Sequence, residues 1–403
     1  MSALPSLRAL WTHPAIVEAR HALAARDDAI LEMQRAIAEI PAPTGEEARR
    51  AAWIAERFCA LGLRDVRTDE VGNVIARRAG VGDAGGAAVA VCAHLDTVFP
   101  ATDAIVVKRD GDRLTGPGVG DNARGLAAML ALAEVLDDSQ LTTRFPVEFV
   151  ATVGEEGAGD LRGAKHYVAT HCASTRALIA LDGAGDDRVV HRALGSRRFH
   201  IALTGPGGHS WNAYGVANPV HALALAAAQL ARLVVPSDAR TTVSVGRIGG
   251  GISVNAIPKD GWLELDARSL APGALDTIHA RVLEIVRAAA EDENRRRTPG
   301  TAPLTEDVRI IGDRPGGETP VDHPLVQLAV DATRAIGGEP ELAAASTDAN
   351  VAIALGIPAI AIGAGGVGGG AHTPEEWYDN RDGAAGLARA LAIVVGAAGG
   401  VAG

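Results

Sequence analysis

The sequence is short of aromatic residues and of cysteine. Only 3% of its 403 residues are aromatic, so small aliphatic side chains must fill the interior. The three cysteines, Cys59, Cys92 and Cys172, are far apart, and none belongs to a Cys-x-x-Cys pair. This usage argues against a disulfide framework and predicts a reducing compartment. We expect Cys92, two residues before His94, to be a small buried core residue.

Long apolar stretches and an excess of positive charge are also missing. No apolar run reaches the length of about 18 residues that suggests a membrane span, and the N-terminus lacks a charged segment followed by a long apolar one. The net charge of -11 argues against nucleic acid or an anionic membrane as a partner. We therefore expect a cytoplasmic protein that binds neither. The length allows two domains.

Several segments have the pattern of an α/β domain. Continuous apolar runs predict buried strands at residues 87–93, 147–153, 177–181 and 358–362. Helical spacing of apolar residues predicts helices at 14–40 and 125–136. Thr44 and Glu47 have the spacing of a capping box, which predicts a helix from there to about Leu61. Strands that alternate with helices indicate a mostly parallel sheet flanked by helices.

The middle of the chain has a different pattern. Apolar and polar residues alternate at 197–204, 241–248 and 261–268, and helices are predicted at 219–233 and 275–291. This order predicts a smaller α+β domain with an antiparallel, ferredoxin-like sheet. We expect it to occupy residues 195–311, inserted into a larger domain formed by 1–194 and 312–403.

Acids and histidines occupy five short segments, mostly at the ends of predicted strands. They are His94 with Asp96, Asp121 after a glycine-rich run, Glu155 with Glu156, Asp182, and His372 after the glycine-dense stretch 363–370. Three of them have an ordinary alternative: His-x-Asp occurs by chance in loops, an aspartate after glycines is common in turns, and adjacent glutamates can simply be solvated.

The set as a whole indicates a metal site. Open α/β sheets place their sites at the carboxyl ends of the strands. Two imidazoles, several carboxylates and a spare glutamate are the side chains of a two-metal hydrolase. The four positive charges of two divalent cations would be balanced by Asp121, Glu156, Asp182 and one hydroxide.

From Pro41 to His372 these segments resemble the co-catalytic zinc exopeptidase and amidohydrolase family. That family includes carboxypeptidase G-type enzymes, tripeptide aminopeptidases, dipeptidases, aminoacylases and acetylornithine deacetylase. The resemblance implies two divalent metal ions, zinc in the first place, although cobalt and manganese suit the same ligands. It assigns His94 and Asp182 to one ion, Glu156 and His372 to the other, and Asp121 to both.

The resemblance also implies further roles. Glu155 would be the general base, and Asp96 would orient His94 through the second ring nitrogen. The peptide bond between Asp121 and Asn122 would be cis.

The inserted domain and the glycine-dense stretch supply candidate substrate contacts. The resemblance implies that His209 and Asn255 reach the catalytic cleft, often across a homodimer interface formed by the inserted domain. His209 would donate a hydrogen bond to the developing oxyanion, and Asn255 would contact the substrate. Arg268 either clamps a substrate carboxylate or forms a structural salt bridge. Backbone N–H groups of Gly369 and Gly370 are further candidates.

We therefore predict a metal-dependent hydrolase of amide bonds in small peptides, of the exopeptidase or dipeptidase type. An N-acyl-amino-acid amidohydrolase is the alternative. In the family that the chain resembles, an aspartate at the position of Asp182 is associated more with peptidases and acylases than with biosynthetic deacylases. A non-catalytic dimeric binding protein is disfavoured because Glu155 is present. A dinucleotide-binding oxidoreductase is disfavoured because no Gly-x-Gly-x-x-Gly follows the first strand.

Overall fold

The computed structural model describes residues 4–81, 86–100, 105–236 and 239–402. The sequence-based expectation that a targeting segment is lacking rests on the N-terminus. Residues 1–3 of that N-terminus lie outside this description. The chain divides into two compact units. Unit 1 combines Met1–Ala193 with Glu318–Gly403, and unit 2 is Leu194–Gly317. The sequence predicted that the inserted domain ends at residue 311, which lies inside strand β14 (Thr305–Arg314). Unit 2 instead includes the whole strand and ends at Gly317.

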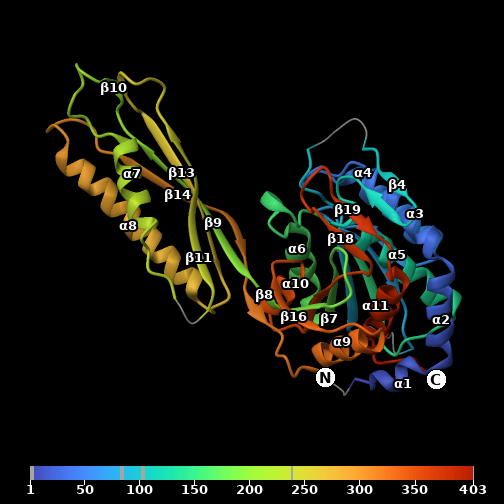
Figure 1. The fold of residues 1–403 in the computed structure, drawn as a ribbon. Coiled ribbons are helices and arrows are strands. Elements are labelled where there is room, and N and C mark those ends of the chain that lie inside the picture. Colours follow the sequence, from blue (N-terminus) through green and yellow to red (C-terminus); the bar gives the residue numbers. More distant parts are fainter. Residues whose placement is uncertain (1–3, 82–85, 101–104, 237–238, 403) are drawn as a thin grey trace. The chain divides into compact units, whose positions relative to one another are not determined.

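Unit 1 is built on a mixed, mostly parallel sheet (Figure 1). Its strands, in spatial order, are β1 (Arg64–Thr68), β2 (Val74–Arg78), β6 (Val147–Thr152), β3 (Ala88–His94), β7 (Thr175–Leu181), β17 (Ala359–Ile362), β8 (Arg188–Ala193) and β15 (Gly317–Glu318), with β16 (Glu341–Ala345) paired to β8. The central strands β6, β3, β7 and β17 are parallel. The predicted α/β class is confirmed.

Side chains of the central strands alternate between two cores. On β3, Val89, Val91 and Ala93 belong to one core, whereas Ala90 and Cys92 belong to the other. Cys92 is fully buried, as expected of a core residue. The surrounding helices are α1 (Leu7–Trp11), α2 (Pro14–Ala25), α3 (Asp27–Ala38), α4 (Ala48–Ala60), α5 (Ala123–Asp138), α6 (Arg162–His171), α9 (Pro324–Ala335), α10 (Ala349–Ala354) and α11 (Gly383–Ala397). No helix within the described residues is long and apolar enough to cross a bilayer.

Two helix predictions need correction. The single helix expected over 14–40 is broken at Arg26 into α2 and α3, and Asp27 and Asp28 at the start of α3 suit the positive end of its dipole. The capping-box prediction is wrong, because α4 begins at Ala48 and makes no side-chain cap. The Thr44 hydroxyl donates instead to Asp96, so interactions around the candidate site override the local capping signal.

Unit 2 has the predicted ferredoxin-like arrangement. Its elements follow in the order β9 (Gly195–Thr204), α7 (Pro219–Leu230), β11 (Thr241–Gly250), β13 (Asp260–Ser269), α8 (Ala274–Arg296) and β14. The strands form an antiparallel sheet in the order β11, β13, β9, β14. Helices α7 and α8 lie together on one face of it (Figure 1). A separate two-stranded pair joins β10 (Gly208–His209) to β12 (Ala256–Ile257).

Candidate metal centre

The parallel strands of unit 1 bring the predicted ligands to one edge of the sheet. His94 ends β3, Glu156 follows β6 and Asp182 follows β7. Because β6, β3 and β7 are parallel neighbours, their carboxyl ends meet. Asp121 lies just before α5. His372 lies between the short strands β18 (Val367–Gly369) and β19 (Trp377–Asp379).

The carboxylate of Asp121 faces a histidine with each of its oxygens. Oδ1 is 2.9 Å from His94 Nε2, and Oδ2 is 3.2 Å from His372 Nε2. His372 Nε2 is also 2.8 Å from Glu156 Oε1, and Asp182 Oδ1 is 4.0 Å from His94 Nε2. The five side chains therefore form two adjacent groups that share Asp121. Ligand atoms of His94, Asp121 and Glu156 all lie within 4.8 Å of one another.

The hydrogen bond of His94 tests whether a cation suits this place. His94 Nδ1 is 3.0 Å from the backbone carbonyl oxygen of Asp96, which can only accept, so Nδ1 carries the proton. In the neutral ring, Nε2 then presents a lone pair to Asp121 Oδ1. That oxygen is buried and has no hydrogen-bond partner among the described residues. Two facing acceptors repel each other, and a cation bound by both removes the repulsion.

The electrostatics of the group point the same way. Burial, together with the nearby carboxylate of Asp121, raises the pKa of Asp182 to about 7. Burial also raises the pKa of Glu156. The hydrogen bond with Asp121 raises the pKa of His372 to about 9, against the opposing effect of burial. Asp182 and Glu156 therefore resist ionisation, whereas His372 favours its protonated form. Divalent cations would offset the same negative charge, so the residues fit the metals that the sequence implied.

Asp96 contacts His94 through its backbone, and the orienting role of its carboxylate stays a prediction. Its Oδ1 is 3.6 Å from His94 Nδ1, beyond hydrogen-bond distance, and its backbone carbonyl contacts the ring instead. The carboxylate accepts hydrogen bonds from the backbone N–H groups of Glu155 at 2.9 Å and Glu156 at 3.0 Å. It also accepts the Thr44 hydroxyl at 2.8 Å. Asp96 thus fixes the segment that carries the predicted base and one predicted ligand.

Asn122 joins two parts of the centre. The bond between Asp121 and Asn122 is cis, as predicted. The side-chain oxygen of Asn122 accepts from the N–H groups of Gly125 and Gly183, each at 3.1 Å, and its nitrogen donates to the Leu181 carbonyl at 2.9 Å. The start of α5 is thereby tied to the end of β7. Asn122 is a neighbour of a predicted ligand, but no motif in the sequence indicates this contact.

Two buried glutamates were not anticipated as parts of the centre. Glu47 accepts the N–H of Gly154 at 3.0 Å. Glu376 accepts N–H groups of the segment before α5. Both are acceptors for backbone that carries predicted ligands or the predicted base. In the sequence, Glu376 cannot be told from its exposed neighbour Glu375.

The predicted substrate-binding glycines shape the segment before His372. Gly369 pairs with Trp377 across β18 and β19. Gly370 has a φ of +70°, and its carbonyl accepts the Thr373 N–H at 3.0 Å. The structure gives these glycines a local structural role, and their contact with substrate stays a prediction.

Unit 2 carries the other predicted substrate contacts. The exposed His209 accepts the Trp211 N–H at Nδ1, 3.2 Å away. In the neutral ring the proton is then on Nε2, which is free of that bond and can donate. Asn255 accepts the Ser253 hydroxyl at 2.6 Å. Arg268 donates to Asp266 on the same strand at 2.8 Å, which is the salt-bridge alternative. A role of Arg268 in substrate binding stays a prediction.

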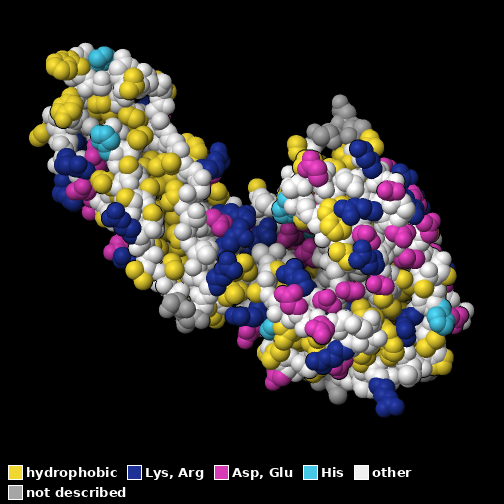
Figure 2. All heavy atoms as spheres, in the orientation of Figure 1, with side chains coloured by type: hydrophobic (Ala, Val, Ile, Leu, Met, Phe, Trp, Pro, Cys, Tyr) yellow, Lys and Arg dark blue, Asp and Glu magenta, His cyan; other side chains and the backbone are white. Residues whose placement is uncertain are grey.

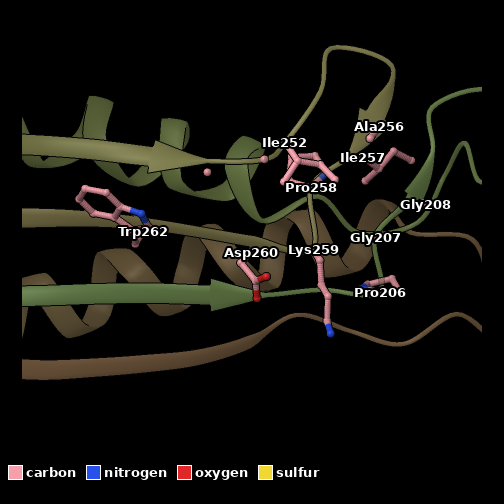
Figure 3. Close-up of a pocket in the computed structure, with 12 residues that line it drawn as sticks. Pro206, Gly207, Gly208, Ile252, Ala256, Ile257, Pro258, Lys259, Asp260 and Trp262 are labelled. Atoms are coloured by element: carbon pink, nitrogen blue, oxygen red, sulfur yellow. The ribbon is translucent and has the colours of Figure 1, made fainter.

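A hollow of about 610 Å³ lies beside β10 and β12 within unit 2 (Figure 3). Its walls include residues next to His209 and Asn255, together with Lys259, Asp260 and Trp262. Figure 2 shows hydrophobic side chains at the end of this unit that bears β10. The exposed large apolar residues of the nearby loops are Trp211, Tyr214, Ile252 and Val254.

Comparisons with known proteins agree with this geometry. Residues 90–396 match the family described as Peptidase family M20/M25/M40. The chain is 27% identical over 347 residues to a putative succinyl-diaminopimelate desuccinylase of Mycobacterium tuberculosis, covering 83% of this chain and 89% of the relative.

Two solved structures share the fold. A tripeptidase of Staphylococcus aureus gives a TM-score of 0.75 at 23% identity, covering 92% of this chain and 98% of that chain. A dinuclear metal-binding peptidase of the M20 family from Bacillus subtilis gives 0.67 at 17% identity, covering 92% and 98%. At these identities the structures show a common fold, and the family match shows the relationship. The chain belongs to peptidase family M20/M25/M40.

Proposed function

We propose that this chain hydrolyses amide bonds of small peptides, as an exopeptidase or dipeptidase, with two divalent cations that are zinc in the first place. The observation that carries the proposal is Asp121, whose two oxygens face His94 and His372 separately. A shared carboxylate of this kind suits a two-metal site. When bound, such cations polarise the scissile carbonyl and make water acidic enough to attack near neutral pH.

The side chains have distinct roles in this proposal. His94 and Asp182 would hold one cation, and Glu156 and His372 the other, with Asp121 shared. Glu155 takes a proton from the attacking water and returns it to the leaving amine. Its buried position, 5% exposed, limits competition from bulk water. Asp96 accepts the backbone N–H of Glu155, which supports the backbone that carries the base.

Metal removal is the direct test. We expect a mixed panel of dipeptides, tripeptides and N-acyl amino acids to show cleavage of short peptides that a chelator abolishes and added Zn²⁺ or Co²⁺ restores. Product formation is followed by chromatography. Cleavage that survives complete removal of the metal would overturn the metal mechanism.

The same panel decides between the two substrate classes. An N-acyl-amino-acid amidohydrolase is the second candidate, favoured by the Mycobacterium tuberculosis relative, whose name denotes a deacylase. Preference for N-acyl amino acids over all peptides would establish it. If reconstituted protein cleaves nothing in the panel, a non-catalytic binding role becomes the better proposal.

We further propose that unit 2 forms a homodimer and brings His209 and Asn255 to a catalytic centre. Strand β11 lies at the edge of its sheet, and Ile248 on it is 52% exposed. An edge of this kind can pair with a second copy. Sedimentation that detects only monomers would contradict the dimer.

The unpaired cysteines support the cytoplasmic location expected from the sequence.

His209→Ala tests the proposed oxyanion contact. Removal of one such donor lowers kcat by about 10²–10³-fold in comparable sites, and we expect a loss of that size with little change in KM. The exposed side chain contributes little to folding, so the melting temperature should not move. His221→Ala is the matched control, since His221 lies in the same unit and is 67% exposed. A normal kcat for His209→Ala would remove this residue from the mechanism.

A further inference from the structure

Glu376 is a buried carboxylate that binds backbone rather than a charged side chain. It is 2% exposed. Its Oε2 accepts the N–H of Gly118 at 2.8 Å. Its Oε1 accepts the N–H groups of Gly120 at 2.8 Å and Asp121 at 2.7 Å. The Glu376 backbone carbonyl also accepts the Gly116 N–H at 2.8 Å. Four hydrogen bonds thus hold the segment that ends in the shared carboxylate.

Two glycines of this segment have a structural reason, one in the close approach of Glu376 and one in its backbone conformation. A Cβ on Gly120 would lie 3.0 Å from Glu376 Oε1, closer than such atoms normally come. Gly118 has a φ of +69°, a backbone conformation that other residues rarely adopt. The run Gly116 to Gly120 therefore lets three N–H groups converge on one carboxylate, and this fixes the backbone from which Asp121 extends.

Glu376 is also linked, through backbone hydrogen bonds, to the turn that carries His372. Its own N–H donates to the Thr373 carbonyl at 3.1 Å, and the Thr373 N–H donates to the Gly370 carbonyl at 3.0 Å. These bonds form a compact turn in which His372 has a φ of +65°. Glu376 therefore connects the turn that bears His372 with the segment that bears Asp121. These two residues lie 3.2 Å apart at their nearest ligand atoms.

We propose that Glu376 is a positioning residue that sets Asp121 and His372 in ligating geometry before a cation arrives. This inference rests on the proposed function, because it takes both residues as ligands. A carboxylate is suited to the task because all its lone pairs accept. A glutamine of the same shape offers one oxygen and one NH₂ group, so an N–H of the segment would face another donor.

The experiment compares Glu376→Gln with Glu375→Gln, a control at the adjacent exposed position. Each metal-free protein is titrated with Co²⁺, and binding is followed by the visible absorption spectrum and by competition with a chromophoric chelator. Loss of a partner that orients a ligand typically costs 10–100-fold in metal affinity. We expect a loss of about that size in Glu376→Gln, with an altered Co²⁺ spectrum, and wild-type behaviour in Glu375→Gln.

The outcomes separate this inference from the proposed function. If the wild-type protein fails to bind two Co²⁺ ions, the proposed function fails. If it binds them and folded Glu376→Gln binds them with equal affinity and an unchanged spectrum, the positioning role is overturned. Should Glu376→Gln not fold, Glu376→Asp keeps both acceptor oxygens at a shorter reach. A folded Glu376→Asp with wild-type affinity and spectrum would equally overturn the inference, and a weakened site with an altered spectrum would support it.

Discussion

Glu155→Ala should retain two metal ions per chain and lose about 10³-fold in kcat. A positioned general base contributes about 10²–10⁴-fold, and alanine cannot take the proton from water. The backbone N–H of residue 155, which donates to Asp96 at 2.9 Å, is unaffected by the substitution. The segment that carries Glu156 should therefore stay in place. Steady-state kinetics and elemental analysis of the same preparation measure the two effects together.

Glu375→Ala is a suitable control for this experiment, because it removes an exposed glutamate outside the centre. It should leave kcat and metal content unchanged. A near-normal kcat in Glu155→Ala would refute the base assignment. Loss of metal from Glu155→Ala would instead show that Glu155 is a ligand.

Asp121→Asn should reduce the metal content from two ions to one or none. Asparagine keeps the size of the side chain, but it carries no charge and only one of its terminal atoms can ligate. The single side-chain oxygen of asparagine cannot ligate both the cation held by His94 and the cation held by His372. Activation of water and carbonyl by cations contributes several kcal/mol, and each 1.4 kcal/mol is about a tenfold change in rate. We therefore expect kcat to fall by about 10³-fold or more.

Asp110→Asn, an exposed aspartate on the short strand β4 (Lys108–Asp110), controls for the change of charge. It should behave like the wild type in metal content and rate. Two tightly bound ions in Asp121→Asn would show that Asp121 is not shared between them. The substitution would then act on one ion or only on local structure.

The predicted ligands were accessible to sequence reasoning because each follows a recognisable signal. His94 and Asp182 end apolar runs, and Asp121 follows a run of glycines. Strand ends in a parallel sheet converge whatever the intervening loops do, so the order of residues sufficed to predict a cluster. The edge of the sheet positions His94, Glu156 and Asp182, and Asp121 and His372 reach the same place from other segments.

The supporting contacts could not be predicted, because they depend on distances between segments. Thr44 has a capping-box spacing, yet its hydroxyl donates to Asp96. The hydrogen bonds from the backbone of Glu155 and Glu156 to the Asp96 carboxylate follow from the packing of two neighbouring strand ends. Glu376 reaches backbone 255 to 258 positions earlier in the chain. No local sequence pattern indicates a hydrogen-bond partner that lies so far away in the chain.

The inserted position of unit 2 has a consequence for the order in which the protein assembles on the ribosome. β17 lies between β7 and β8 in the sheet of unit 1, although it is made after all of unit 2. The strands of unit 2 follow one another closely in sequence, so this unit can fold while β7 and β8 still lack their common neighbour. His372 emerges later still. A nascent chain that stalls before β17 therefore exposes two unpaired strand edges, and shielding them is a task for chaperones.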